Sequence, residues 1–181
     1  ILDAVKATRN VVNHNTNLGI ILLLAPLAAV PGDRSLRDGI DEVLRRTTVE
    51  DSRLVYEAIR IAQPSGLGEA SDQDLNNQPT LNLLECMGLA ADRDMIAAQY
   101  GNGFQHVLHD GQNWLREYSA SAVSQPQQIT MLAVRLLAEF GDSLIARKCG
   151  VEMSGVVRKK ARLLLDSGWP MQRDTAAQFA A

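Results

Sequence analysis

Apolar residues recur at helical spacing along most of the chain, and this pattern predicts helices rather than strands. After Ser35, for example, the positions Leu36, Ile40, Val43 and Leu44 fall on one face of a helix. No stretch of the chain combines strict apolar–polar alternation with β-branched enrichment, which strands would require. The pattern therefore predicts an all-α fold class, a single globular multi-helix domain with no sheet.

Capping residues and helix breakers set the expected boundaries. The expected helices cover residues 1–12, 18–30, 35–47, 51–63, 81–90, 91–104, 112–123, 127–148 and 152–167. The residues expected to cap them are Ser35, Thr48 with Asp51, Thr80, Asp110, Gly150 and Gly168. The longest irregular stretch is 64–79, and a loop of that length inside a compact domain is often functional.

The run Leu18–Val30 carries no charged or polar side chain. A membrane-spanning helix needs about 20 apolar residues, whereas this run is shorter and contains Pro26. We therefore expect a helix buried on all sides in a helical core, with Ile20 to Leu24 almost wholly buried.

Length, composition and net charge narrow the class of protein to which the chain can belong. The chain has 181 residues, is 46% hydrophobic and 22% charged, and has a formal net charge of −3. These values predict one helical domain over residues 1–181, with no general attraction to nucleic acid or to a membrane surface. Its two cysteines form no metal or disulfide motif, which favours a cytoplasmic location. The chain begins and stops inside apparent helices, so we expect a fragment of a longer chain.

Polar residues precede the apolar run, in the order Asn-His-Asn-Thr-Asn over 13–17. The first N–H groups of a helix lack intrahelical partners and its N-terminus is partly positive, so an anion such as phosphate is favoured there. Asn15, Thr16 and Asn17 are therefore candidate ligand contacts, although they can equally cap the helix. Gly19, one turn further on, permits close approach of another backbone or a ligand.

The loop after residue 64 contains two glycines, Gly66 and Gly68, followed by Glu69. The glycines suit phosphate binding or an ordinary turn, because the loop is neither a P-loop nor a dinucleotide fingerprint. Glu69, together with Asp72 and Asp74, offers the hard oxygen ligands that Mg²⁺ prefers. The alternative is a solvated acidic loop.

Asp92 and Asp94 bracket Arg93 and point to different faces of the expected helix. One carboxylate is expected to pair with the arginine while the other faces a cleft. The alternative is that both form surface ion pairs.

Asp142 interrupts the apolar pattern of the expected 127–148 helix. A carboxylate near a core stripe is costly without a partner or a metal. Arg147 and Lys148 follow in the last turn, where they favour the helix dipole or bind phosphate. His106 and His109, at i and i+3, could bind a metal together, but no third ligand is evident.

Taken together, six short motifs resemble the triphosphoribosyl-dephospho-CoA synthase family, whose members are ATP:dephospho-CoA triphosphoribosyltransferases. The similarity runs along nearly the whole chain, and the order and spacing of the motifs are more specific than any one of them. The motifs are 15-NTNLG-19, 66-GLGEA-70, 91-ADRDMIA-97, 99-QYGNGF-104, 142-DSLIARKCG-150 and 168-GWP-170.

The resemblance implies an all-helical enzyme that transfers the 5-triphosphoribosyl group of ATP to 3′-dephospho-CoA and releases adenine. Such chemistry needs a carboxylate near the sugar and a base for the incoming hydroxyl. The resemblance assigns catalysis and Mg²⁺ binding to Glu69 and Asp142. It assigns nucleotide contacts to a larger set: Asn15, Thr16, Asn17, Gly19, Gly66, Gly68, Asp92, Arg147 and Lys148.

The chain also departs from the family pattern. Family members read closer to Asn-Thr-His-Lys-Gly where this chain has 15-NTNLG-19, and closer to Asp-Thr where it has Asp142-Ser143. Early Lys-Pro-Gly and late Asn-Pro-Gly-Thr motifs are absent, which agrees with missing ends. These differences indicate a divergent branch. They leave a pterin-type cofactor intermediate as an alternative acceptor, and a non-catalytic helical nucleotide-binding module as a third reading. The sequence does not determine the oligomeric state, and a homodimer is one alternative.

Overall fold

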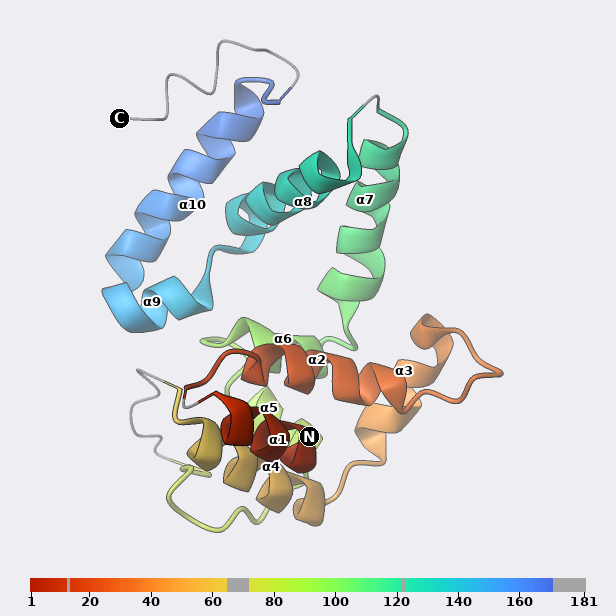
Figure 1. Cartoon of the computed structure of the whole chain (residues 1–181), viewed down its shortest axis with the longest axis vertical. Coiled ribbons are helices and arrows are strands. Elements are labelled where there is room, and N and C mark those ends of the chain that lie inside the picture. The colour runs from red at the N-terminus through yellow and green to blue at the C-terminus, as the bar shows by residue number, and fades with distance from the viewer. Residues whose placement is uncertain (13, 65–71, 122, 171–181) are drawn as a thin grey trace. The chain divides into compact units, whose positions relative to one another are not determined.

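The computed structural model describes residues 1–12, 14–64, 72–121 and 123–170, and these residues form helices and connecting turns without any strand. The predicted all-α class is therefore confirmed for the described chain (Figure 1). The helices are α1 (Leu2–Val11), α2 (Leu18–Ala28), α3 (Leu36–Arg45), α4 (Val49–Ala62), α5 (Leu83–Gly88), α6 (Met95–Gly101), the π-helix η1 (His106–Gly111), α7 (Gln112–Ser119), α8 (Gln125–Phe140), α9 (Ser143–Cys149) and α10 (Val151–Asp166).

Backbone contacts divide the chain into two compact units, Ile1–Leu108 and His109–Ala181. The prediction of one domain over residues 1–181 stays a prediction. In the first unit, α1 packs on α4, α5 packs on α6, and α2 packs on both α3 and α6. The most deeply buried side chains of this core are Ile40, Leu44, Ala58, Tyr100 and Phe104.

The second unit is built on α8, which is covered by α7 and by α10. The ring of Trp114 on α7 lies 6.1 Å from that of Phe140, between ring centroids, and the guanidinium of Arg135 stands 4.7 Å from the centroid of Trp114. Trp114 therefore packs within this unit, as tryptophan usually does. Arg158 and Arg162 from α10 donate to the Ala138 carbonyl at the end of α8.

The N-caps predicted at Ser35 and at Thr48 are confirmed. The Ser35 hydroxyl accepts from the Asp38 N–H and starts α3. Thr48 and Asp51 form the predicted capping box of α4, with the Asp51 carboxylate accepting from the Thr48 N–H at 2.7 Å. Each cap satisfies an N–H group that the helix itself leaves without a partner.

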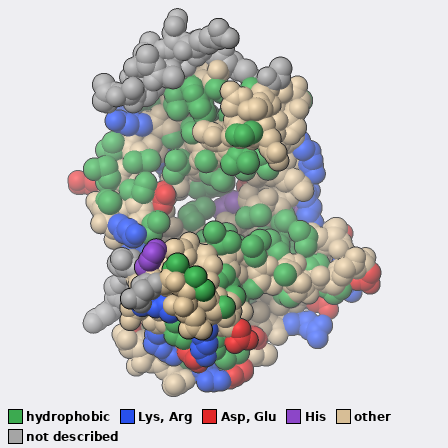
Figure 2. Space-filling model, viewed as in Figure 1, with side chains coloured by type: hydrophobic (Ala, Val, Ile, Leu, Met, Phe, Trp, Pro, Cys, Tyr) green, Lys and Arg blue, Asp and Glu red, His purple; other side chains and the backbone are tan. Residues whose placement is uncertain are grey.

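The prediction that Ile20 to Leu24 are almost wholly buried is wrong. Leu18, Leu22 and Pro26 face the core at a spacing of four residues, whereas Ile20 and Leu24 are each 58% exposed. Figure 2 shows green apolar side chains on the surface where Figure 1, in the same view, draws α2. Apolar side chains can occupy every face of a helix, but only those on the face that packs against a neighbouring helix are buried.

Three other boundaries differ from the sequence prediction. The helix expected at 81–90 is capped by Asn82, not Thr80, because Asn82 and Glu85 form a reciprocal capping box. The helix expected at 91–104 instead begins after a turn, at Met95. Asp110 caps no helix, since it lies inside η1, which continues directly into α7.

The single helix expected over 127–148 is also wrong, because the chain breaks at Gly141. That residue has φ of +76°, a conformation open to glycine, and α9 starts two residues later. Among the described helices, none is long and apolar enough to cross a membrane.

Candidate functional site

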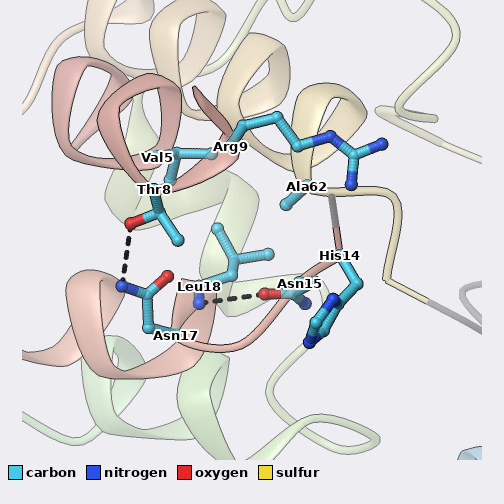
Figure 3. A pocket seen from close by; sticks show the side chains of 8 residues that line it. All are labelled: Val5, Thr8, Arg9, His14, Asn15, Asn17, Leu18 and Ala62. Carbon is cyan, nitrogen blue, oxygen red and sulfur yellow. Dashed lines mark hydrogen bonds between the residues drawn. The ribbon is translucent and has the colours of Figure 1, made fainter. Parts of the chain in front are cut away.

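The polar residues ahead of α2 line a small recess in the first unit (Figure 3). The recess is small and open: the space between its lining residues amounts to about 210 Å³ and includes open solvent. It is lined by Val5, Thr8, Arg9, His14, Asn15, Asn17, Leu18 and Ala62. The sequence-predicted contacts Asn15 and Asn17 are therefore brought together, at the predicted helix start.

Asn15 is a helix-capping residue. Its side-chain oxygen accepts from the Leu18 N–H at 3.1 Å, which satisfies one of the first N–H groups of α2. Asn17 occupies the N-cap position without making a cap hydrogen bond, and its amide instead donates to the Thr8 hydroxyl on α1 at 3.0 Å. Both asparagines thus fix the start of α2 against its surroundings, and Thr16 between them is exposed.

Arg9 places a positive charge at this recess. Figure 3 shows its guanidinium and the His14 ring on the side away from the Asn17–Thr8 hydrogen bond. One guanidinium nitrogen of Arg9 donates to the side-chain oxygen of Gln63 at 3.4 Å. The cation and the positive end of the α2 dipole therefore lie at one recess, an arrangement that favours an anion. Sequence reasoning missed Arg9, because its only signal was a basic residue in the last turn of α1.

The segment that carries Gly66, Gly68 and Glu69 lies outside the described residues. The described residues just before this segment lie at the recess: Ala62 lines it, and the Gln63 side-chain oxygen accepts from Arg9. On the other flank, the Asp72 and Asp74 carboxylates accept from the backbone N–H groups of Gln73 and Asn76. These two aspartates thus have local turn roles.

Gly19 lies where α2 meets α6. A Cβ atom at Gly19 would stand 3.4 Å from the Ile96 Cδ1 atom, which is ordinary van der Waals contact. In the described structure this glycine contacts an apolar side chain of α6 at an ordinary distance, and the predicted close approach of a backbone or a ligand stays a prediction.

Asp92 lies exposed on the turn before α6, outside any helix. The expectation that Asp92 and Asp94 share a helix is therefore wrong. Asp94 is half-buried and is the N-cap of α6, where one carboxylate oxygen accepts from the Ile96 and Ala97 N–H groups at 2.8 and 3.1 Å. An aspartate directly before an apolar helix is the signal that identifies this cap.

Asp142 has the same geometry at the start of α9. One carboxylate oxygen accepts from the Leu144 and Ile145 N–H groups at 2.7 and 3.0 Å. Its backbone is held from α10, because the Ser154 hydroxyl donates to the Asp142 carbonyl at 2.9 Å. Asp142 therefore does not interrupt a helix, and these N–H groups are the partners that its charge requires.

Arg147 and Lys148 lie in the last turn of α9, five and six residues after Asp142. Arg147 is half-buried and Lys148 is exposed. Basic residues at this end complement the helix dipole, as the structural alternative predicted. Their role as phosphate contacts stays a prediction.

The predicted convergence of all these residues in one cleft also stays a prediction. Asn15 and Asn17 share the recess of the first unit, Asp142 belongs to the second unit, and Glu69 lies outside the described residues. Within the described ranges, no group of three or more His, Cys, Asp and Glu side chains could hold a metal ion. Cys86 and Cys149 are both free, the first buried and the second exposed.

The fold and these helix-start aspartates, asparagines and basic side chains define an all-helical protein with candidate anion-binding positions. The sequence profile of the ATP:dephospho-CoA triphosphoribosyl transferase (CitG) family matches residues 1–181, the whole chain. The chain belongs to this family of transferases, as the motifs predicted. No curated protein and no solved structure matches it.

Proposed function

We propose that the protein transfers the 5-triphosphoribosyl group of ATP to 3′-dephospho-CoA and releases adenine. The family match over residues 1–181 is the observation that carries this proposal. The reaction displaces adenine from the ribose C1′ atom, so the site must bind a highly charged triphosphate and stabilise positive charge on the sugar.

The α2 recess is the proposed triphosphate site. Arg9 supplies a full positive charge there, and α2 supplies the positive end of its dipole. Many family members have a lysine where this chain has Leu18, and Leu18 is buried in the core with 7% of its surface exposed. Arg9, which comes from α1 to the same recess, compensates for that missing cation.

Asp142 and Glu69 are the proposed carboxylates of the reaction. The Asp142 carboxylate is half-buried and one of its oxygens is held by two backbone N–H groups, so its position is fixed before a substrate binds. Mg²⁺ typically binds proteins through one or two carboxylates and fills its other positions with phosphate oxygens and water. In this proposal Asp142 supplies such a carboxylate, as the family resemblance also assigns to Glu69, and a bound Mg²⁺ would neutralise phosphate charge.

One observation favours a second candidate for the acceptor. Asn17 and Leu18 replace the family's usual His-Lys pair, and they face α1 and the core. An acceptor other than dephospho-CoA, such as a pterin-type cofactor intermediate, is therefore the alternative. A cytoplasmic location and a homodimer are part of the same proposal.

The test is an adenine-release assay with ATP, Mg²⁺ and each acceptor in turn. We expect adenine with 3′-dephospho-CoA and none without an acceptor. If adenine were released only with a pterin-type acceptor, that compound would be the acceptor, and the proposed reaction of ATP would stand. If no acceptor led to adenine release although calorimetry showed that ATP binds, the protein would be a non-catalytic nucleotide-binding module.

A further inference from the structure

Two basic side chains that come from different segments line the recess ahead of α2. Arg9 lies in the last turn of α1, and His14 lies in the segment that joins α1 to α2 (Figure 3). On the α4 side the recess is lined by the apolar Ala62. Among the described lining residues, Arg9 and His14 are therefore the groups that carry or can take up a charge, and both are basic.

The charge of Arg9 has no carboxylate partner among the described residues. Its guanidinium donates to the neutral side chain of Gln63, at a distance of 3.4 Å. By contrast, Lys6 on the same helix forms an ion pair with Glu57 of α4 at 2.9 Å. Because hydrogen bonds from a guanidinium to phosphate oxygens are strong, Arg9 favours a phosphate anion from solution at the recess.

The His14 ring is accessible to such an anion. His14 is exposed, and none of the described residues forms a hydrogen bond or an ion pair with its ring. The positive charge of Arg9 disfavours a second positive charge on His14 before an anion binds. An anion that contacts both side chains reverses this effect, because a neighbouring negative charge favours the protonated imidazole. Binding of the anion and uptake of the proton are therefore linked.

We infer that His14 takes up a proton when a triphosphate binds in the α2 recess, so that the ligand is held by Arg9 and a protonated His14. The inference rests on the triphosphate site of the proposed function. The bound anion stabilises the protonated ring, and the ring is protonated more readily as pH falls. Binding of a triphosphate should therefore become tighter from pH 8 to pH 6. His14 is in this inference a binding residue, with no part in the displacement of adenine.

Proton uptake is tested on the full chain with inorganic tripolyphosphate, without Mg²⁺. This probe has the linked phosphates of ATP but no sugar or base. The ring-carbon proton of His14 is assigned by its loss in His14→Gln and followed by NMR from pH 5 to pH 9. We expect saturating tripolyphosphate to raise the midpoint of this titration by about one pH unit, the effect of a close opposite charge. His109, which does not line the recess, is the internal control, and its midpoint should not move.

The effect on affinity is tested by calorimetry with the same probe at pH 6 and pH 8. His14→Gln keeps an N–H donor but cannot take up the proton, and comparison with it removes the probe's own titration. We expect the ratio of affinities at pH 6 and pH 8 to be about fivefold larger in the unmodified protein than in His14→Gln, since one titration moves by about one unit. His109→Gln should keep the ratio of the unmodified protein. Circular dichroism checks that each variant is folded.

The outcomes separate this inference from the proposed function. If tripolyphosphate bound without moving the His14 midpoint, the inference would be overturned and the triphosphate site would stand. If tripolyphosphate did not bind while ATP still released adenine, the recess and the inference would both be overturned, and the proposed reaction would stand. A raised His14 midpoint in a protein that releases no adenine would support the inference and overturn the reaction.

Discussion

Ser154 on α10 holds Asp142 by both backbone polar groups: its hydroxyl donates to the Asp142 carbonyl at 2.9 Å and accepts from the Asp142 N–H at 3.4 Å. The contact joins residues twelve positions apart in sequence. It fixes the point where α8 ends and α9 begins. The position of the Asp142 carboxylate therefore depends on α10 as well as on its own helix.

Ser154→Ala should loosen this arrangement. We expect a loss of about 1 kcal/mol in the free energy of unfolding, the usual net contribution of a hydrogen bond. Adenine release should fall by roughly tenfold, because small displacements of a catalytic group are costly. The matched control is Ser167→Ala, since in the described part of the chain that hydroxyl donates to the Leu164 carbonyl near the end of the same helix. Equal activity of the two variants would show that Ser154 does not position the site.

Asp142 combines a cap with a charge, and two substitutions separate them. Asparagine caps helices about as well as aspartate, so Asp142→Asn should keep the helical circular dichroism signal and most of the stability. We expect it to lower adenine release by roughly 100-fold or more, the range of a lost acid–base group. Asp142→Ala should lose about 1 kcal/mol of stability in addition.

The cap of α3 supplies the control for this pair. Ser35→Ala removes a comparable cap, so it should lower stability by a similar amount and leave adenine release unchanged. An Asp142→Asn variant with full activity would assign Asp142 a capping role alone.

The sequence predicted what depends on neighbouring residues. Ser35 and the Thr48–Asp51 pair cap their helices as expected, whereas Thr80 and Asp110, which are local signals of the same kind, cap none. The ordered motifs also identified the family. In contrast, the apolar spacing runs on from Leu136 through Phe140 to Leu144 and hides the break at Gly141. Gly141 followed by Asp142 is a local signal for a helix end and a new cap, which the continuing apolar spacing outweighed, and the α10 side chains that hold the break lie far away in sequence.

The burial of individual side chains and the contacts between residues far apart in sequence were harder to predict. The run after Leu18 is apolar on every face, so its composition could not show that Ile20 and Leu24 point away from the core. The Gln99 Nε2 atom lies 2.9 Å from the His106 Nδ1 atom across the left-handed turn at Phe104, for which the sequence carries no local signal. The sequence thus marked the polar residues ahead of α2 but not Arg9, which comes from another helix to the same recess.

Tyr100 predicts an alkaline pH dependence. Burial raises the pKa of this tyrosine above its ordinary value of 10.0, and its hydroxyl donates to the Leu22 carbonyl at 2.7 Å. Above pH 10 the unfolded chain loses the tyrosine proton while the folded chain keeps it. The free energy of unfolding should therefore fall as pH rises, by up to about 1.4 kcal/mol per pH unit from this group.

Tyr100→Phe tests that assignment. It should cost about 1 kcal/mol near pH 7 through the lost hydrogen bond. It should also flatten the decline above pH 10, since phenylalanine does not titrate. Urea unfolding of both proteins between pH 7 and 11 measures the two curves. Parallel curves over the whole range would assign the alkaline decline to other groups.

Asn17→Asp should weaken nucleotide binding and leave stability nearly unchanged. A negative charge at the start of α2 favours the helix dipole by about 0.3–1 kcal/mol, which offsets the lost donation to Thr8. The same charge repels a triphosphate in the recess, so ATP should bind at least about tenfold more weakly in calorimetry. Asn10→Asp, an exposed change of equal charge on α1, should leave ATP affinity unchanged. If Asn17→Asp bound ATP as tightly as the unmodified protein, the triphosphate would have to lie elsewhere, and the polar residues ahead of α2 would serve only to start the helix and fasten it to α1.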